Sequence, residues 1–148
     1  MQAETHAATL DPVALDEAAK AALAGLEGKT LGNRDRLAIP AQEMPTQDPA
    51  LRVTNMEEVA LGYSPAQARV EAERCLSCRN APCVEGCPVR IDIPGFLGHA
   101  AKGDFAQALA VIRQSSLLPA VCGRVAPRSR SARSAAPWAR ASSRWKKP

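Results

Sequence analysis

The stretch "RCLSCRNAPCVEGCP", residues 74–88, places four cysteines within thirteen positions. Their spacing is C-x2-C-x4-C-x3-C-P, and the cysteines are Cys75, Cys78, Cys83 and Cys87. Cysteine thiolates are the ligands of iron–sulfur clusters and of many zinc sites. A C-x2-C loop brings two sulfurs to neighbouring positions on one metal centre, and a proline after the last cysteine turns the chain away from it. The stretch therefore predicts a metal-binding loop around which the rest of the chain folds.

The spacing favours iron over zinc. Zinc sites usually combine two C-x2-C pairs with a longer insert between them, and the trailing C-x3-C-P is unusual for such sites. The bacterial ferredoxin run also ends in C-x3-C-P, but its middle spacing is two rather than four. The alternative hypothesis is a zinc-binding adaptor whose basic C-terminal residues bind nucleic acid.

The composition and the helix-start signals predict an all-α fold. Aromatic residues make up 3% of the chain, so a core would consist of small aliphatic side chains, which suits packed helices. Capping residues and helical spacing predict short helices over 11–25, 55–62, 64–73, from about Pro94 to Gly103, and from Asp104, with Phe105, Leu109 and Ile112 on one face. Residues 27–53 show no clear period and are expected to form an extended strap or linker.

The positive charge is concentrated at the C-terminus. Residues 126–148 hold seven Lys or Arg and no Asp or Glu, whereas residues 1–125 hold twelve basic and fifteen acidic residues. The last 23 positions contain little that could build a core, and we expect them to be disordered. The N-terminus lacks the pattern of a secretory signal, so we expect a cytoplasmic protein whose thiols stay reduced.

Residues 35–125 resemble the N-terminal domain of the small (beta) subunit of NADPH-dependent glutamate synthase. Similar domains occur in NAD-dependent ferredoxin:NADP oxidoreductases and, more distantly, in domain II of dihydropyrimidine dehydrogenase. Any one of the matching stretches alone would be weak, but together they are specific. They are "MPTQDP", "EVALGY", "RCLSC", "PCVEGCPV", "DIPGF", "GDFAQAL" and "LPAVCGRV".

The resemblance implies a small helical, α-helical ferredoxin-like domain with two 4Fe–4S clusters, followed by an FAD domain and an NADPH domain. Electrons would pass from NADPH through FAD and the clusters to a large partner subunit, where glutamate is formed. By position, Cys75, Cys78 and Cys83 resemble ligands of the first cluster, and Cys87 resembles the first ligand of the second. Cys122 matches a family cysteine that is not a ligand.

The resemblance also implies that this chain is a fragment with an incomplete ligand set. We expect an N-terminal helix and linker in residues 1–34, the cluster-binding domain in 35–125 and a tail in 126–148. Because this chain offers four of the eight ligands that the family needs, it is expected to bind at most one cluster. Without the FAD and NADPH domains and the large subunit, it is expected to be inactive alone. Neither a membrane nor a nucleic acid is its expected partner.

The residues after Val125 have the composition expected of a shifted reading frame. The family pattern continues beyond "CGRV" with cysteines where this chain has Ala126, Ala132 and Ala136. After deletion of one upstream nucleotide, the last two bases of a TGC cysteine codon are read together with the next base. The resulting codon is GCx, which encodes alanine. We therefore expect that the tail is translated out of frame; the alternative is an ordinary Ala/Arg/Ser-rich tail.

Overall fold

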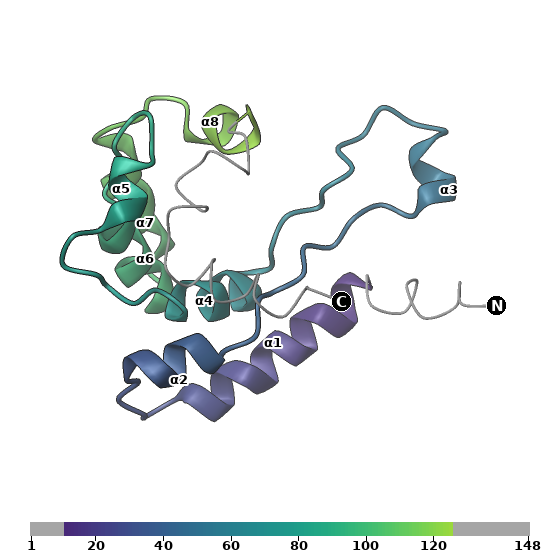
Figure 1. The fold of residues 1–148 in the computed structure, drawn as a ribbon. Helices are drawn as coiled ribbons and strands as arrows, with labels where there is room; N and C mark the ends of the chain where they lie inside the picture. Colours follow the sequence, from purple (N-terminus) through teal and green to yellow (C-terminus); the bar gives the residue numbers. More distant parts are fainter. Residues whose placement is uncertain (1–10, 126–148) are drawn as a thin grey trace, which may run out of the picture.

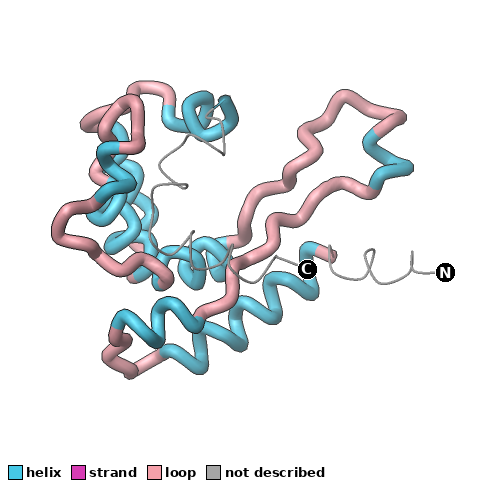
Figure 2. The backbone as a smooth tube through the Cα atoms, in the orientation of Figure 1, coloured by secondary structure: helices cyan, strands magenta, loops and turns pink. Residues whose placement is uncertain are grey.

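The computed structural model describes residues 11–125, which form eight α-helices joined by loops (Figures 1 and 2). The helices are α1 (Pro12–Leu26), α2 (Asn33–Ala38), α3 (Pro49–Arg52), α4 (Pro65–Glu73), α5 (Pro82–Glu85), α6 (Ile93–Ala101), α7 (Phe105–Arg113) and α8 (Pro119–Val125). Within residues 11–125 no strand is present, and the extended backbone pairs in one isolated antiparallel bridge. The predicted all-α fold is confirmed. The tail expected to be disordered, 126–148, lies outside the described residues.

The capping signals identify four of these helices correctly. At α4, the Ser64 hydroxyl accepts from the Gln67 amide and the Gln67 side chain accepts from the Ser64 amide, both at 3.1 Å. This reciprocal pair satisfies two N–H groups that the first turn of a helix leaves unpaired. The carboxylates of Asp11, Asp92 and Asp104 accept from first-turn amides of α1, α6 and α7 in the same way.

Helix α4 lies between two small hydrophobic clusters and joins them. The first cluster combines α1, the segment after α2 and one face of α4; its buried members are Ala19, Leu23, Ile39, Ala66 and Val70. The second joins α4 to α6 and α7 through Ala72, Ala100 and Ala108. Because α4 packs on both sides, its C-terminal end, which leads into the cysteine stretch, has a fixed position in the fold.

An arm formed by residues 40–63 reaches away from the packed helices, with α3 near its tip (Figure 1). Its two extended segments lie side by side, because the Gln47 amide donates to the Val59 carbonyl at 2.8 Å and the Leu61 amide donates to the Pro45 carbonyl at 2.9 Å. The bridge between Thr46 and Ala60 lies at the same place.

The helix predicted over 55–62 is wrong. Residues 55–62 contain no helix and form one side of the arm instead. The Asn55 side chain accepts from the Glu57 amide at 2.9 Å, which is a local turn that competes with helix formation. The main-chain pairing of Val59 and Leu61 with the opposite segment of the arm then keeps this stretch extended.

The structure refines three other expectations. The strap over 27–53 contains two short helices, α2 and α3. Helix α1 ends at Leu26, and the glycine that adopts a left-handed conformation after it is Gly28, with φ 74°, rather than Gly25. On α7 the fully buried residue is Ala108, whereas Phe105 and Leu109 are each more than a third exposed. The contact of α7 with α4 and α6 is made by alanines, whose small side chains let the helices pack closely together.

Candidate metal centre

The four cysteines of the 74–88 stretch lie in one segment between α4 and α6. Cys75 follows α4 directly, and its amide donates to the Ala72 carbonyl at 3.1 Å, so the helical turn carries it into place. Cys83 lies within α5. Both residues are buried, whereas Cys78 and Cys87 are half-buried. All five cysteines of the chain are free thiols in the structure.

The backbone of this segment is tightly curved. Ser77, between the first two cysteines, has φ 47°, and Ala81, before α5, has φ 33° and ψ 62°. Arg90, after the last cysteine, has φ 51°. Residues other than glycine adopt this left-handed region at a cost in conformational energy. Such positions concentrate in segments that must follow a tight path, as a loop around a metal centre does.

The Cys83 thiol is influenced by two other thiols of the same segment, Cys75 and Cys78. Burial raises the pKa of the Cys83 thiol, and the nearby Cys75 raises it further; the backbone N–H groups of Cys83 and Val84 oppose this shift, and Cys78 adds to it. Cys75 and Cys78 therefore lie within electrostatic range of Cys83. Cys87 does not contribute to the pKa shift of Cys83.

The residues fit a cluster better than they fit a single ion. Among residues 11–125, no three His, Cys, Asp or Glu side chains are arranged to hold one metal ion. A 4Fe–4S cluster is wider than an ion, since each thiolate binds a different iron atom. Soft thiols in one segment, two of them buried, with backbone N–H groups acting on Cys83 are the type of donor that such a cluster binds.

Cys122 is separate from this group. It lies in α8, where its Sγ is 3.5 Å from the hydroxyl of Ser116. The sequence signals did not predict α5 or α8, although each begins with a proline, Pro82 and Pro119, which is common at the first position of a helix.

The chain matches the family described as dihydropyrimidine dehydrogenase domain II, 4Fe-4S cluster, over residues 52–140. The chain belongs to this family. The matched range covers all four cysteines of the 74–88 stretch and continues past Val125. The 4Fe–4S cluster is therefore the cofactor of the family to which these thiols belong, and the resemblance stated above is confirmed.

Curated relatives agree with this assignment. The chain is 40% identical over 80 residues to the glutamate synthase [NADPH] small chain of Escherichia coli K12, covering 54% of this chain and 17% of that protein. It is 39% identical over 72 residues to an NAD-dependent dihydropyrimidine dehydrogenase subunit PreT homolog of Salmonella typhi, covering 49% and 17%. The small chain of Azospirillum brasilense is 33% identical over 91 residues, covering 61% and 19%.

The chain thus spans less than a fifth of the length of these relatives. These relatives are named as a chain or subunit of an oxidoreductase. Together with the family match, the names support an iron–sulfur electron-transfer role for this chain. Of the helices in residues 11–125, none combines the length and the hydropathy needed to cross a bilayer.

Proposed function

We propose that this chain carries the cluster-binding part of an NADPH-dependent glutamate synthase small subunit, or of a close relative, and acts in the cytoplasm. The observation that carries the proposal is the placement of Cys75, Cys78 and Cys83 in one curved segment after α4, where Cys75 and Cys78 act electrostatically on Cys83. When bound there, a 4Fe–4S cluster would accept and donate single electrons. In the complete assembly these electrons would come from NADPH through FAD and would leave to the glutamate-forming large subunit.

The residues of this chain supply the environment that such a cluster needs. Cys75 and Cys83 are 9% and 8% exposed, so their sulfurs are shielded from water. Burial raises the pKa of the Cys83 thiol, and the N–H groups of Cys83 and Val84 offset part of this rise in favour of the thiolate, which is the form that binds iron. Cys87 is proposed to serve a different cluster, because the resemblance places it as the first ligand of a second cluster.

Anaerobic reconstitution with iron and sulfide tests this proposal. The full 148-residue chain should turn brown and hold at most one cluster. Three protein thiolates leave one iron without a protein ligand, so an oxygen-sensitive cluster that converts to a 3Fe–4S form is expected. Electron paramagnetic resonance and iron and sulfide analysis would measure this.

Cysteine variants make the test specific. Cys78→Ser should abolish the colour, whereas Cys122→Ser, the matched control in α8, should leave it unchanged. Colourless protein with one tightly bound zinc per chain would instead support the zinc-binding adaptor. Two stable 4Fe–4S clusters per chain would contradict the expectation that this chain holds at most one cluster.

A further inference from the structure

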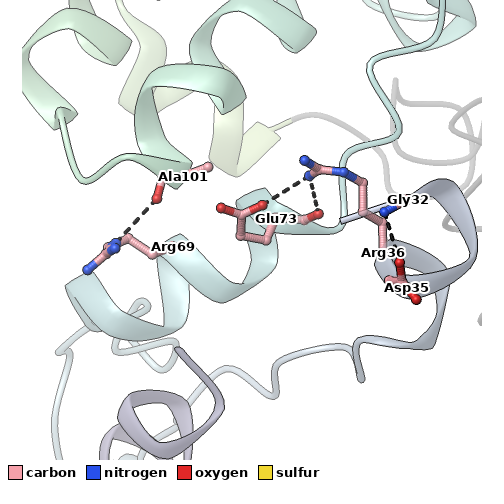
Figure 3. Close-up of polar contacts among 6 residues, drawn as sticks. All are labelled: Gly32, Asp35, Arg36, Arg69, Glu73 and Ala101. Atoms are coloured by element: carbon pink, nitrogen blue, oxygen red, sulfur yellow. Dashed lines mark hydrogen bonds and ion pairs between the residues drawn. The ribbon is translucent and has the colours of Figure 1, made fainter. Parts of the chain in front are cut away.

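The C-terminal end of α4 is held from outside by an arginine of α2. The last carbonyls of a helix have no partner within the helix. The Arg36 Nη1 donates to the main-chain carbonyl of Glu73 at 2.6 Å and to its carboxylate at 3.0 Å (Figure 3). A cation at this end also interacts favourably with the helix dipole. Cys75 is two residues further along the chain, so Arg36 fixes the point from which the cysteine segment departs.

A second carboxylate in the same turn binds the same strap. Glu71 accepts from the Gln42 amide through Oε2 at 3.0 Å and from Arg74 through Oε1 at 2.6 Å. The side chains of Arg74 and Glu71 are only 4% and 17% exposed, so solvent screens this ion pair little. Arg74 directly precedes Cys75. One ion pair, Arg36–Glu73, and one hydrogen bond, from the Gln42 amide to Glu71, thus join residues 36–42 to the end of α4.

Apolar packing connects the same strap to α1. Ile39, between Arg36 and Gln42, is 7% exposed and lies in the cluster that contains Leu23 of α1 and Val70 of α4. The Gln67 side chain donates to the Glu43 carbonyl at 2.9 Å, which extends the contact to the base of the arm. Residues 12–43 therefore form a continuous support along α4, and they precede residue 52, where the family match begins.

We propose that this N-terminal support, residues 12–43, positions the cysteine segment for its metal, with Arg36 as the positioning residue for Cys75. The inference rests on the proposed cluster site. Arginine suits the task because its planar guanidinium donates to the carbonyl and the carboxylate from a fixed orientation, whereas a lysine ammonium is a single flexible donor group. Residues that orient a metal ligand without touching the metal change metal affinity about 10–100-fold when they are replaced.

Cobalt(II) titration of the full, reduced chain is the test, since the thiolate-to-cobalt charge-transfer band reports how many cysteines bind. Arg36→Gln should weaken cobalt binding about tenfold or more. At saturation its band should be reduced toward that of Cys75→Ser. Arg34→Gln, which changes an exposed arginine of the same helix, should retain the wild-type affinity and band. Arg36→Lys should restore part of the band.

Glu73→Gln provides a second, milder variant. It weakens the ion pair but retains the bond to the main-chain carbonyl, so its loss of affinity should be smaller than that of Arg36→Gln. If circular dichroism shows that Arg36→Gln does not fold, Glu73→Gln must still reduce the charge-transfer band for the inference to stand.

The outcomes separate this inference from the proposed function. A wild-type chain that shows no thiolate–cobalt band and also forms no cluster on anaerobic reconstitution with iron and sulfide would contradict the proposed metal centre itself. If only the cluster forms, Arg36→Gln must hold less iron and sulfide than Arg34→Gln for the role of Arg36 to stand. A wild-type band with equal affinities for Arg36→Gln and Arg34→Gln would overturn only the role of Arg36. A weaker affinity with an unchanged band at saturation would also overturn it, because general destabilisation lowers affinity without removing a ligand.

Discussion

Arg124 of α8 donates two hydrogen bonds to the Glu58 carboxylate, from Nε to Oε1 at 2.8 Å and from Nη2 to Oε2 at 2.7 Å. This paired geometry is the strongest form of contact between arginine and a carboxylate. The two residues are 66 positions apart, and their contact joins α8 to the arm. Helix α8, which follows the cysteine stretch in the chain, is therefore attached to the arm, which precedes that stretch.

This contact should make the position of the arm depend on pH. The hydrogen bonds from Arg124 hold the pKa of Glu58 below its ordinary value of 4.5. A lowered pKa in the folded state means that the contact contributes fully above the ordinary pKa and is lost as the pH falls through the lowered one. At pH 7, hydrogen exchange of the arm amides of Gln47 and Leu61 should be faster in Glu58→Gln than in the wild type.

The same comparison supplies its own controls. The difference between Glu58→Gln and the wild type should shrink as the pH falls through the lowered pKa of Glu58. It should also shrink in high salt, because both side chains are more than half exposed. Glu57→Gln, which removes the neighbouring carboxylate, should exchange like the wild type at every pH. Equal exchange of Glu58→Gln and the wild type at pH 7 would show that the contact does not restrain the arm.

The core around α4 predicts which valine matters for stability. Val70 is 0% exposed and lies in the first hydrophobic cluster, whereas Val59 on the arm is 41% exposed. Removing two buried methyl groups costs about 2 kcal/mol from lost transfer free energy and the cavity left behind. Urea unfolding followed by circular dichroism should show this loss for Val70→Ala and a change below about 0.5 kcal/mol for Val59→Ala. Similar losses for both variants would contradict the packing described here.

Local signals predicted the helices whose starts are determined by nearby side chains. The Ser64–Gln67 pair and the Asp104 cap bond residues only three positions away, so the sequence alone identifies α4 and α7. The helix predicted after Asn55 is wrong because the conformation of this stretch depends on hydrogen bonds to the other side of the arm, such as that between Leu61 and Pro45. A capping pattern contains no information about such a distant partner.

In the candidate site, too, the features set by nearby residues could be predicted from the sequence, and the contacts between distant residues could not. The spacing of the cysteines predicted which residues could bind metal, since their chemistry is rare and their separation is short. The contact of Arg36 with Glu73 spans 37 positions and involves two of the commonest surface residue types. Nothing in a single sequence marks such a pair, and only the folded arrangement of α2 and α4 brings Arg36 to Glu73 at the end of α4 (Figure 3), two residues before Cys75 in the chain.

The coding sequence tests the expected change of frame. Ala126, Ala132 and Ala136 stand where the resemblance expects cysteines, and the family match continues to residue 140 across them. We expect that inserting one nucleotide before the codon for Ala126 restores cysteine at all three positions. Trp138 and Trp145, both encoded by TGG, constrain the restored frame further. A restored frame without these three cysteines would show that the tail is simply rich in Ala, Arg and Ser.

Replacing Ala81, the left-handed residue before α5, by glycine should stabilise the fold, whereas a glycine substitution inside a helix destabilises it. Ala81 has φ 33° and ψ 62°, a conformation that costs residues with a Cβ about 1–2 kcal/mol. Ala81→Gly relieves that cost, although the more flexible unfolded chain offsets about half of it. The free energy of unfolding should therefore rise by up to about 1 kcal/mol in urea unfolding of the metal-free chain. Ala106→Gly, at an exposed position inside α7, should instead lower it by about 1 kcal/mol.

Cobalt binding by Ala81→Gly should stay within about twofold of the wild type, because the backbone path between Cys78 and Cys83 is unchanged. An equal loss of stability in both glycine variants would show that the curved segment is not strained at Ala81.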